Sequence, residues 1–285
     1  MVSRADRGIV ANWWWTVDKL LLFSALVLML AGIVLSLAAS PPVAERIGVE
    51  NFHFVKRHAM FLVPAIAILF GVSLLKAKQA RRLAILVLAG SLVLMLAVLF
   101  IGFEAKGARR WISLGPFLLQ PSEFLKPAFV VVTAFLFAEN QRRPEIPGNW
   151  LAVALFLIAV GLLMLQPDLG QTVLVAGVWG AMFFLAGMPW LWIAILGVVG
   201  IAGLTGAYLT LPHVSGRIDR FMTGTGDTFQ VDRGREAIVR GGWLGEGPGE
   251  GSVKRILPDS HTDFISSVTA EEFGILVSML MVAIF

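Results

Sequence analysis

The stretch LPDSHTDFISS (residues 257–267) holds the densest group of side chains in this sequence that could do acid–base chemistry. A carboxylate within hydrogen-bond reach of a hydroxyl can act as a general base, and Asp263 is the candidate. His261 and Thr262 directly precede it and could bind a polar substrate. The alternative is a helix N-cap, for which Asp263, Thr262 or Ser260 would each be suitable.

The segment that follows is apolar up to Phe285, so Asp263 is expected where a loop enters a membrane-spanning helix. Beside low-dielectric lipid a carboxylate is partly desolvated, which increases its basicity. Glu271 and Glu272 lie within the same span. A charge there is costly, so we expect both glutamates to face protein or water.

Cations occur at two other predicted membrane boundaries. Lys56 and Arg57 stand in NFHFVKRH, where they could clamp a phosphate or snorkel to the interface. Arg109 and Arg110 precede Trp111 in the stretch GARRW. These cations are not required by topology, so an anionic ligand is the interpretation that we carry forward.

Glu123 and Lys126 are three residues apart at the start of another apolar segment, so a helix would bring them to one face. Such a pair should face the bundle interior or a water-filled cavity. It could fix helix packing, or it could line a cavity that holds a polar head group. Asp168, in the turn LQPDLGQT, is interpreted as an N-cap.

The run GGWLGEGPGEG (residues 241–251) resembles a phosphate-binding loop only superficially. It lacks the GK[ST] ending of a Walker A loop and a preceding strand. A flexible loop with tight turns is the structural interpretation.

The composition of the chain indicates lipid as its solvent. The 285 residues are 57% hydrophobic and 15% charged, with no cysteine, so disulfides and thiolate metal sites are excluded. The four histidines show no HExxH spacing. The net charge of +4 is better explained by residues that flank membrane spans than by nucleic acid binding, which we do not expect.

We therefore expect an all-α polytopic membrane protein with eight transmembrane helices in this chain. The predicted spans lie near residues 20–40, 59–75, 83–103, 122–138, 150–166, 169–187, 189–211 and 264–285. Because the last span is still apolar at Phe285, we expect the natural protein to continue.

The loops predict the orientation of the spans. KAKQARR (residues 76–82) and NQRRPE (residues 140–145) are short and basic, which predicts that they and the N-terminus are cytoplasmic. The long polar loop at residues 212–263 would then be extracytoplasmic, as would several cations. These are Lys56, Arg57, Lys106, Arg109, Arg110, Arg217, Arg220, Arg233, Arg235, Arg240, Lys254 and Arg255.

The motifs FHFVKRH, RRWISLGPFLLQPSEFLK, LMLQPDLG, GRIDRF and LPDSHTDFISSVTAEEFG occur in an order that resembles the SEDS family of shape, elongation, division and sporulation proteins. The resemblance runs from residue 51 to the end of the chain and is stronger to division members than to elongation members. It implies one membrane domain with a family fold of ten spans, of which residues 1–285 would be a C-terminally truncated part. It also implies peptidoglycan glycosyltransferase activity on lipid II. On this resemblance Asp263 is the essential acid, and Trp111, Glu123 and Lys126 match family positions.

The implied reaction suits these residue types. A sugar hydroxyl is a poor nucleophile and needs a base, whereas a diphosphate leaving group needs positive charge rather than a proton. Asp263 is the predicted base, and the candidates for diphosphate binding are Lys56, Arg57, Arg109, Arg110 and Lys126. No cofactor is assigned. A divalent cation, Mg²⁺ or Mn²⁺, is an alternative source of positive charge.

The resemblance also implies partners and location: lipid II, polyprenyl-diphosphate-linked glycan, a class B penicillin-binding transpeptidase and other division membrane proteins, in the bacterial cytoplasmic membrane. The predicted active site faces the periplasm. Two alternatives remain open, a lipid II flippase and an elongation-type polymerase. A scaffold that recruits the transpeptidase is a further role.

Overall fold

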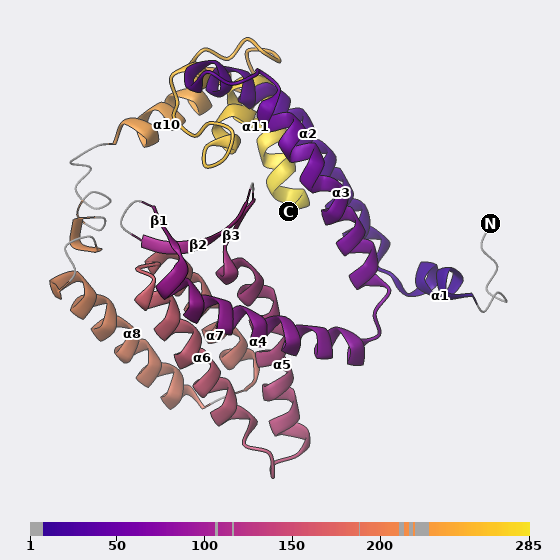
Figure 1. Ribbon diagram of the computed structural model, residues 1–285, viewed down its shortest axis with the longest axis vertical. Coiled ribbons are helices and arrows are strands. Elements are labelled where there is room, and N and C mark those ends of the chain that lie inside the picture. Colours follow the sequence, from indigo (N-terminus) through magenta and orange to yellow (C-terminus); the bar gives the residue numbers. More distant parts are fainter. Residues whose placement is uncertain are drawn as a thin grey trace. The chain divides into compact units, whose positions relative to one another are not determined.

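A computed structural model describes residues 8–105, 108–115, 117–187, 189–210, 214–216, 219 and 228–285 (Figure 1). Lys106, Arg217 and Arg220, three of the predicted extracytoplasmic cations, lie outside these residues. The chain folds as two compact units. The first unit consists of residues 1–74 and 219–285, and the second consists of residues 75–218. The prediction of a single membrane domain stays a prediction.

The first unit contains five α-helices and a 3₁₀ turn within the described residues. They are α1 (Ile9–Thr16), α2 (Lys19–Ile47), α3 (His53–Ser73), α10 (Phe229–Gly241), the turn η1 (Val253–Arg255) and α11 (Ile265–Ile284). Asp18 caps α2 by accepting from the backbone N–H groups of Leu20 and Leu21, at 2.9 and 3.1 Å. The indole of Trp13 donates to Ser73 Oγ at 2.9 Å, which ties α1 to the end of α3.

In the part of the second unit that the structure describes, long helices pack beside a small sheet. Its helices are α4 (Ala77–Ile101), α5 (Pro121–Arg142), α6 (Gly148–Leu165), α7 (Leu169–Leu185) and α8 (Trp190–Thr210). Its core is built around large side chains. Trp179 of α7 stacks on Phe156 of α6 with ring centroids 4.5 Å apart, and Phe129 and Met95 are fully buried. Arg81, near the start of α4, lies over the ring of Phe135, near the end of α5, so these helices run antiparallel.

This antiparallel packing places the two basic loops of the second unit at one end. Residues 76–82 begin α4, and residues 140–145 follow the last turns of α5. The sheet and the α6–α7 turn lie at the other end, since Arg110 of the sheet donates to the carbonyls of Gln166 and Pro167. The two short basic loops, which were predicted to share one side of the membrane, therefore lie at the same end of this unit.

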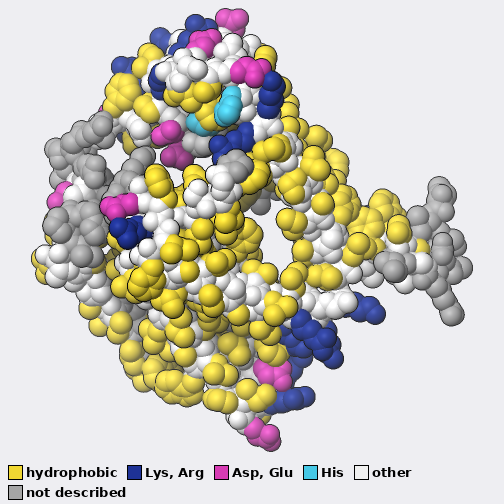
Figure 2. Space-filling view, in the orientation of Figure 1, with side chains coloured by type: hydrophobic (Ala, Val, Ile, Leu, Met, Phe, Trp, Pro, Cys, Tyr) yellow, Lys and Arg dark blue, Asp and Glu magenta, His cyan; other side chains and the backbone are white. Residues whose placement is uncertain are grey.

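Each of the eight predicted spans contains a helix. Among the described residues, seven helices are long and apolar enough to cross a bilayer, and α7, with 17 residues, is a shorter apolar helix. The outward faces of the helices are largely hydrophobic (Figure 2). The chain is thus a multi-pass helical membrane protein, whereas the count of eight spans stays a prediction.

A three-stranded antiparallel sheet was not predicted from the sequence. It consists of β1 (Phe103–Ala105), β2 (Ala108–Leu114) and β3 (Phe117–Leu119), in the order β1-β2-β3. The register pairs Glu104 with Arg109 and Ile112 with Leu119. Only two side chains of β2, Ala108 and Ile112, are buried, so the alternation of apolar and polar residues is too short to be a strong signal.

The glycine-rich run closes tightly around α11. Gly274, with φ 85° and ψ 168°, interrupts α11. The carbonyls of Glu271 and Glu272 then accept from the backbone N–H groups of Glu246 and Gly247, at 2.8 and 3.1 Å, and the N–H of Ile275 donates to Gly242. The predicted tight turns are confirmed, since several of these glycines have positive φ.

The glycine content of residues 241–251 is explained by packing and not by phosphate binding. A Cβ on Gly241 would lie 1.8 Å from the carbonyl oxygen of Ala270, and one on Gly245 would lie 2.2 Å from that of Glu272. The glycines therefore permit close approach of two backbones.

Candidate active site

Asp263 lies in a series of turns, residues 257–264, directly before α11. Leu257 is fully buried and anchors the start of these turns. The carbonyl of Asp259, a residue with φ 51°, accepts from the N–H groups of Thr262 and Asp263, both at 3.1 Å. The turn is thus organised by its backbone, which leaves the side chain of Asp263 exposed.

The N-cap alternative for this stretch is wrong. Phe264 occupies the cap position of α11, and no side chain makes a cap hydrogen bond. Within the described residues, the carboxylate of Asp263 has no hydrogen bond or ion pair, so it is free to accept a proton from a substrate. The desolvation expected from the sequence is not provided by protein, because the side chain is exposed.

His261 joins this turn to the beginning of α3. Its ring lies against Phe54, with centroids 4.2 Å apart and an interplanar angle of 38°. Burial lowers the pKa of His261 below 6.5, and the charges of Asp259 and Asp263 oppose this effect. The imidazole is therefore neutral near pH 7 and would act on a substrate as a hydrogen-bonding group. Its Nδ1 atom is buried and has no hydrogen-bond partner among the described residues.

The contact between His261 and Phe54 brings the predicted cations of α3 into the same neighbourhood as Asp263. Lys56 and Arg57 follow Phe54 by one turn or less, and both are exposed. Lys56 forms an exposed ion pair with Glu50 at 2.6 Å. An exposed pair of this kind contributes little stability, so Lys56 can exchange Glu50 for an anionic ligand.

The second unit positions the predicted pair Glu123 and Lys126. Their charged atoms are 2.7 Å apart in the first turns of α5, which confirms the spacing argument. Gln171 of α7 donates to Glu123 at 3.3 Å. The pair is thus held by a neighbouring helix while both side chains remain partly exposed.

Arg110 supports the fold more than the sequence indicated. Its guanidinium donates to the carbonyls of Gln166 and Pro167, at 3.2 and 2.6 Å, and lies 3.5 Å from the carboxylate of Asp168. Asp168 caps α7 through the N–H of Gln171, as predicted. Arg110 therefore fixes the α6–α7 turn.

Arg109 and Trp111 lie on the same strand as Arg110. Arg109 forms an exposed pair with Glu104 at 3.3 Å, and Trp111 is half-buried. Of the cations on this strand, Arg109 is the more available to a ligand.

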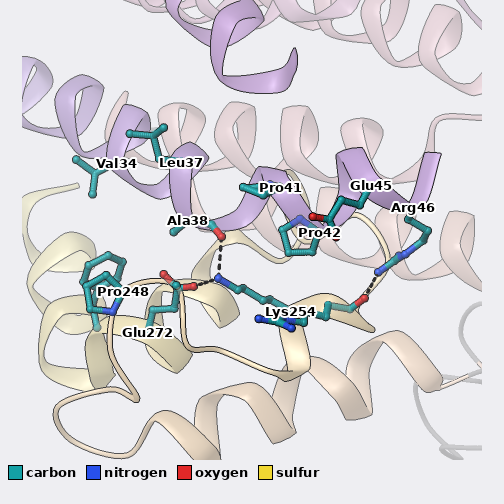
Figure 3. Close-up of a pocket in the computed structure, with 13 residues that line it drawn as sticks. Val34, Leu37, Ala38, Pro41, Pro42, Glu45, Arg46, Pro248, Lys254 and Glu272 are labelled. Carbon is teal, nitrogen blue, oxygen red and sulfur yellow. Dashed lines mark hydrogen bonds and ion pairs between the residues drawn. The ribbon is translucent and has the colours of Figure 1, made fainter. Parts of the chain in front are cut away.

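Three buried charged residues of the first unit were not recognised as a group in the sequence. Glu271 accepts from the backbone N–H groups of Val253 and Lys254, at 2.6 and 3.0 Å. Glu272 forms an ion pair with Lys254, which also donates to the carbonyl of Ala38 at 3.0 Å (Figure 3). The prediction that both glutamates face protein or water is confirmed, since both are buried.

A signal for Lys254 was available in the sequence. Pro42 lies inside α2 and has no N–H, so the carbonyl of Ala38, four residues earlier, lacks its helical donor. A buried carbonyl needs some other donor. The sequence does not indicate that Lys254 is this donor, because Lys254 lies more than two hundred positions from Ala38.

The arrangement combines a free carboxylate with exposed cations at the end of a membrane span, which suits attack by a hydroxyl and departure of an anion. Among the described residues, no group of three or more His, Cys, Asp or Glu is placed to hold a metal ion. The fold defines a class, the multi-pass helical membrane proteins.

The family of the chain follows from comparison with known proteins. The model of the FtsW/RodA/SpoVE family, described as "Cell cycle protein", matches residues 18–285. A relative from Caulobacter vibrioides, named "Probable peptidoglycan glycosyltransferase FtsW", is 44% identical over 285 residues, covering 99% of this chain and 73% of the relative. One of the same name from Aliivibrio salmonicida is 35% identical and covers 90% of this chain and 66% of the relative. The chain belongs to the FtsW/RodA/SpoVE family.

Solved structures support this membership. A structure described as "Structural coordination of polymerization and crosslinking by a peptidoglycan synthase complex" has a TM-score of 0.72 and 26% identity, covering 95% of this chain and 75% of that one. The crystal structure of Thermus thermophilus RodA has a TM-score of 0.59 and 26% identity, with coverage of 95% and 72%. The chain thus spans about three quarters of these proteins.

Proposed function

We propose that this protein is a peptidoglycan glycosyltransferase of the division type, which polymerises lipid II into glycan strands. The observation that carries the proposal is the exposed carboxylate of Asp263, which no helix cap or ion pair in the described residues occupies. Asp263 directly precedes the cap of α11, and its neighbour His261 contacts Phe54 on α3, the helix that carries Lys56 and Arg57. The relatives named peptidoglycan glycosyltransferase FtsW support the same activity.

In the proposed reaction, Asp263 removes the proton from the 4-hydroxyl of an N-acetylglucosamine. The hydroxyl oxygen forms a bond to the anomeric carbon of a second lipid-linked sugar. The bond between that carbon and the diphosphate oxygen breaks, and its electron pair leaves with the polyprenyl diphosphate. The proton passes from Asp263 to solvent, which restores the base.

We propose roles for the other candidate residues as well. In the first unit, Lys56 and Arg57 bind the diphosphate. The neutral imidazole of His261 and the hydroxyl of Thr262 orient sugar hydroxyls by hydrogen bonds. In the second unit, Arg109 and Lys126 are the available cations. Trp111 and Glu123 contact substrate, and Arg110 contributes mainly by holding the α6–α7 turn.

A divalent cation, Mg²⁺ or Mn²⁺, would reduce the negative charge of the leaving diphosphate. We propose that lysine and arginine supply this charge, and an ion held by one carboxylate and the diphosphate is the alternative. Polymerisation that persists in a chelator would support this assignment. A loss restored by Mg²⁺ or Mn²⁺ would contradict it.

The proposed setting is the bacterial cytoplasmic membrane, with the N-terminus in the cytoplasm and Asp263 facing the periplasm. The basic loop at residues 76–82, which directly follows α3, supports this orientation, because short basic loops are retained in the cytoplasm and Phe54, at the other end of α3, contacts His261. The proposed partner is a class B penicillin-binding transpeptidase. The peptidoglycan synthase complex, described by both polymerization and crosslinking, supports such a pairing.

The test compares two isosteric substitutions in one turn, Asp263→Asn and Asp259→Asn, in full-length protein assayed for lipid II polymerisation with its transpeptidase. Removing a general base should lower the rate by roughly 10²–10⁴-fold. Asn tolerates the left-handed conformation of residue 259, so Asp259→Asn should retain most activity. Parental activity of Asp263→Asn would show that this residue is not the base.

A further inference from the structure

A pocket of about 880 Å³ lies within the first unit (Figure 3). Its lining residues do not include the turn at residues 257–264 that carries Asp263. The second half of α2 forms one wall. Two residues of α11, Glu272 and Phe273, form another wall, and the last wall is formed by Pro248, Gly249, Lys254 and Arg255. No step of the proposed glycosyl transfer uses this pocket.

The polar end of the pocket holds an unsatisfied acceptor. Lys254 uses its ammonium group on the carbonyl of Ala38 and on one carboxylate oxygen of Glu272. The second oxygen of Glu272, Oε2, is buried and has no hydrogen-bond partner among the described residues. Glu272 is only 1% exposed, and an unpaired carboxylate oxygen at such a position is costly. A ligand that donates a hydrogen bond would remove this cost.

The other lining residues of the pocket indicate which further groups the ligand carries. Arg46 and Arg255 are exposed cations at the edge of the pocket, and Arg46 is held in place by donating to the carbonyl of Arg255. They suit a phosphate. Val34, Leu37 and Phe273 supply an apolar wall, and the apolar part of α2 continues from there along the helix. The ligand is therefore amphipathic, with a hydrogen-bond donor beside an anion.

A polyprenyl diphosphate does not fit the polar end. At neutral pH a diphosphate offers acceptors and no donor, so it would leave Glu272 Oε2 unpaired and add negative charge beside it. A primary ammonium group has three donors and a positive charge, and it satisfies this oxygen directly.

We propose that this pocket binds an aminophospholipid, with its primary ammonium on Glu272 Oε2, its phosphate at Arg46 and Arg255, and an acyl chain along Val34 and Leu37. The site would couple the lipid to the buried ion pair that joins α2 to α11.

The test is competitive binding of dioleoyl phosphatidylethanolamine and dioleoyl phosphatidylcholine to the purified full chain, measured by native mass spectrometry. The two lipids share acyl chains, phosphate and charge, but the quaternary ammonium of phosphatidylcholine has no N–H. A charge-assisted hydrogen bond should favour phosphatidylethanolamine by about tenfold or more.

Three variants test whether the preference for phosphatidylethanolamine arises in this pocket. Leu37→Trp should fill the space beside the apolar wall without altering the ion pair. The ratio of the affinities for phosphatidylethanolamine and phosphatidylcholine should then be close to one. Glu272→Gln should also reduce it, but this change leaves Lys254 unpaired and lowers stability, so Leu37→Trp is the decisive variant. Leu21→Trp, at an exposed position near the start of α2 and on a different face of that helix from Val34 and Leu37, is the matched control and should keep the parental preference.

Equal binding of the two lipids by the parent would overturn the proposal, as would a preference that survives Leu37→Trp. Tighter binding of phosphatidylglycerol would overturn it too, since the ammonium would then be unnecessary. If Leu37→Trp instead abolished binding of polyprenyl diphosphate, the pocket would belong to the substrate.

Discussion

Two adjacent segments of one loop use their charged residues in opposite ways. In the fixed segment, residues 251–257, Lys254 is buried and bound to Glu272 and to the carbonyl of Ala38. In the exposed turn, residues 258–264, Asp263 is exposed and makes no side-chain bond among the described residues. Both segments precede the same helix, α11.

The difference separates stability from chemistry. A buried charge must be paired, so the acids that contact the fixed segment are committed to structure. A carboxylate that accepts a proton from a substrate must instead have no ion pair or hydrogen bond within the protein before the substrate binds. The exposed turn depends on the fixed segment for its position, because Leu257 and the ion pair anchor its start.

The largest expected effect is loss of the buried ion pair in Lys254→Met. Glu272 would remain as an uncompensated buried charge, which should lower the free energy of unfolding by about 3–5 kcal/mol. Unfolding of purified protein in mixed micelles by SDS titration measures this. The matched variant Lys56→Met removes an exposed pair and should cost less than about 1 kcal/mol. Equal losses in the two variants would contradict the distinction.

A second effect tests the close approach of the glycine-rich run to α11. Gly241→Ala would place a Cβ 1.8 Å from the carbonyl oxygen of Ala270, so a shift of backbone is required. Overpacking of this kind should cost about 1–3 kcal/mol in the same titration. Gly180→Ala, in a helix with open space around it, should be neutral or stabilising. A neutral result for Gly241→Ala would show that the two segments do not pack as described.

A smaller effect concerns pH and His261. Because burial lowers its folded-state pKa below the unfolded value of about 6.5, the unfolded protein binds more protons in the interval between the two. This contribution to stability is present above pH 6.5 and is lost as pH falls through that interval. The melting temperature should therefore fall between about pH 7 and pH 5, and less so in His261→Gln. The same acid sensitivity in parent and variant would assign it to other groups.

The smallest expected change in stability belongs to Asp263→Asn. Because the side chain is exposed and caps no helix, the free energy of unfolding should change by less than about 0.5 kcal/mol. A loss close to that of Lys254→Met would make Asp263 a structural residue, and its effect on polymerisation would then be indirect.

The spans were predictable because each needs only a long apolar run, which is local. The pair Glu123–Lys126 and the cap at Asp168 were predictable because they depend on spacing within a few residues. The sheet was missed because its strands are short and only two side chains of β2 are buried. Helix α10 was missed because it lies in the segment at residues 212–263, which was interpreted as a long polar loop.

Neighbouring cations have different roles in the structure, and their positions in the sequence did not indicate this difference. Arg109 and Arg110 are neighbours, yet Arg109 is exposed, while Arg110 binds the α6–α7 turn. Opposite faces of a strand produce this division, and the strand itself was not predicted.

By itself, the sequence determined that the chain is a multi-pass membrane protein and which acid begins its last span, because hydropathy and local spacing are written in consecutive residues. Only the tertiary structure decided which charges are free. It buried Lys254 and both glutamates, joined His261 to Phe54 and left Asp263 exposed. Pairing between distant segments depends on how helices pack, and no local pattern specifies which donor reaches which acceptor.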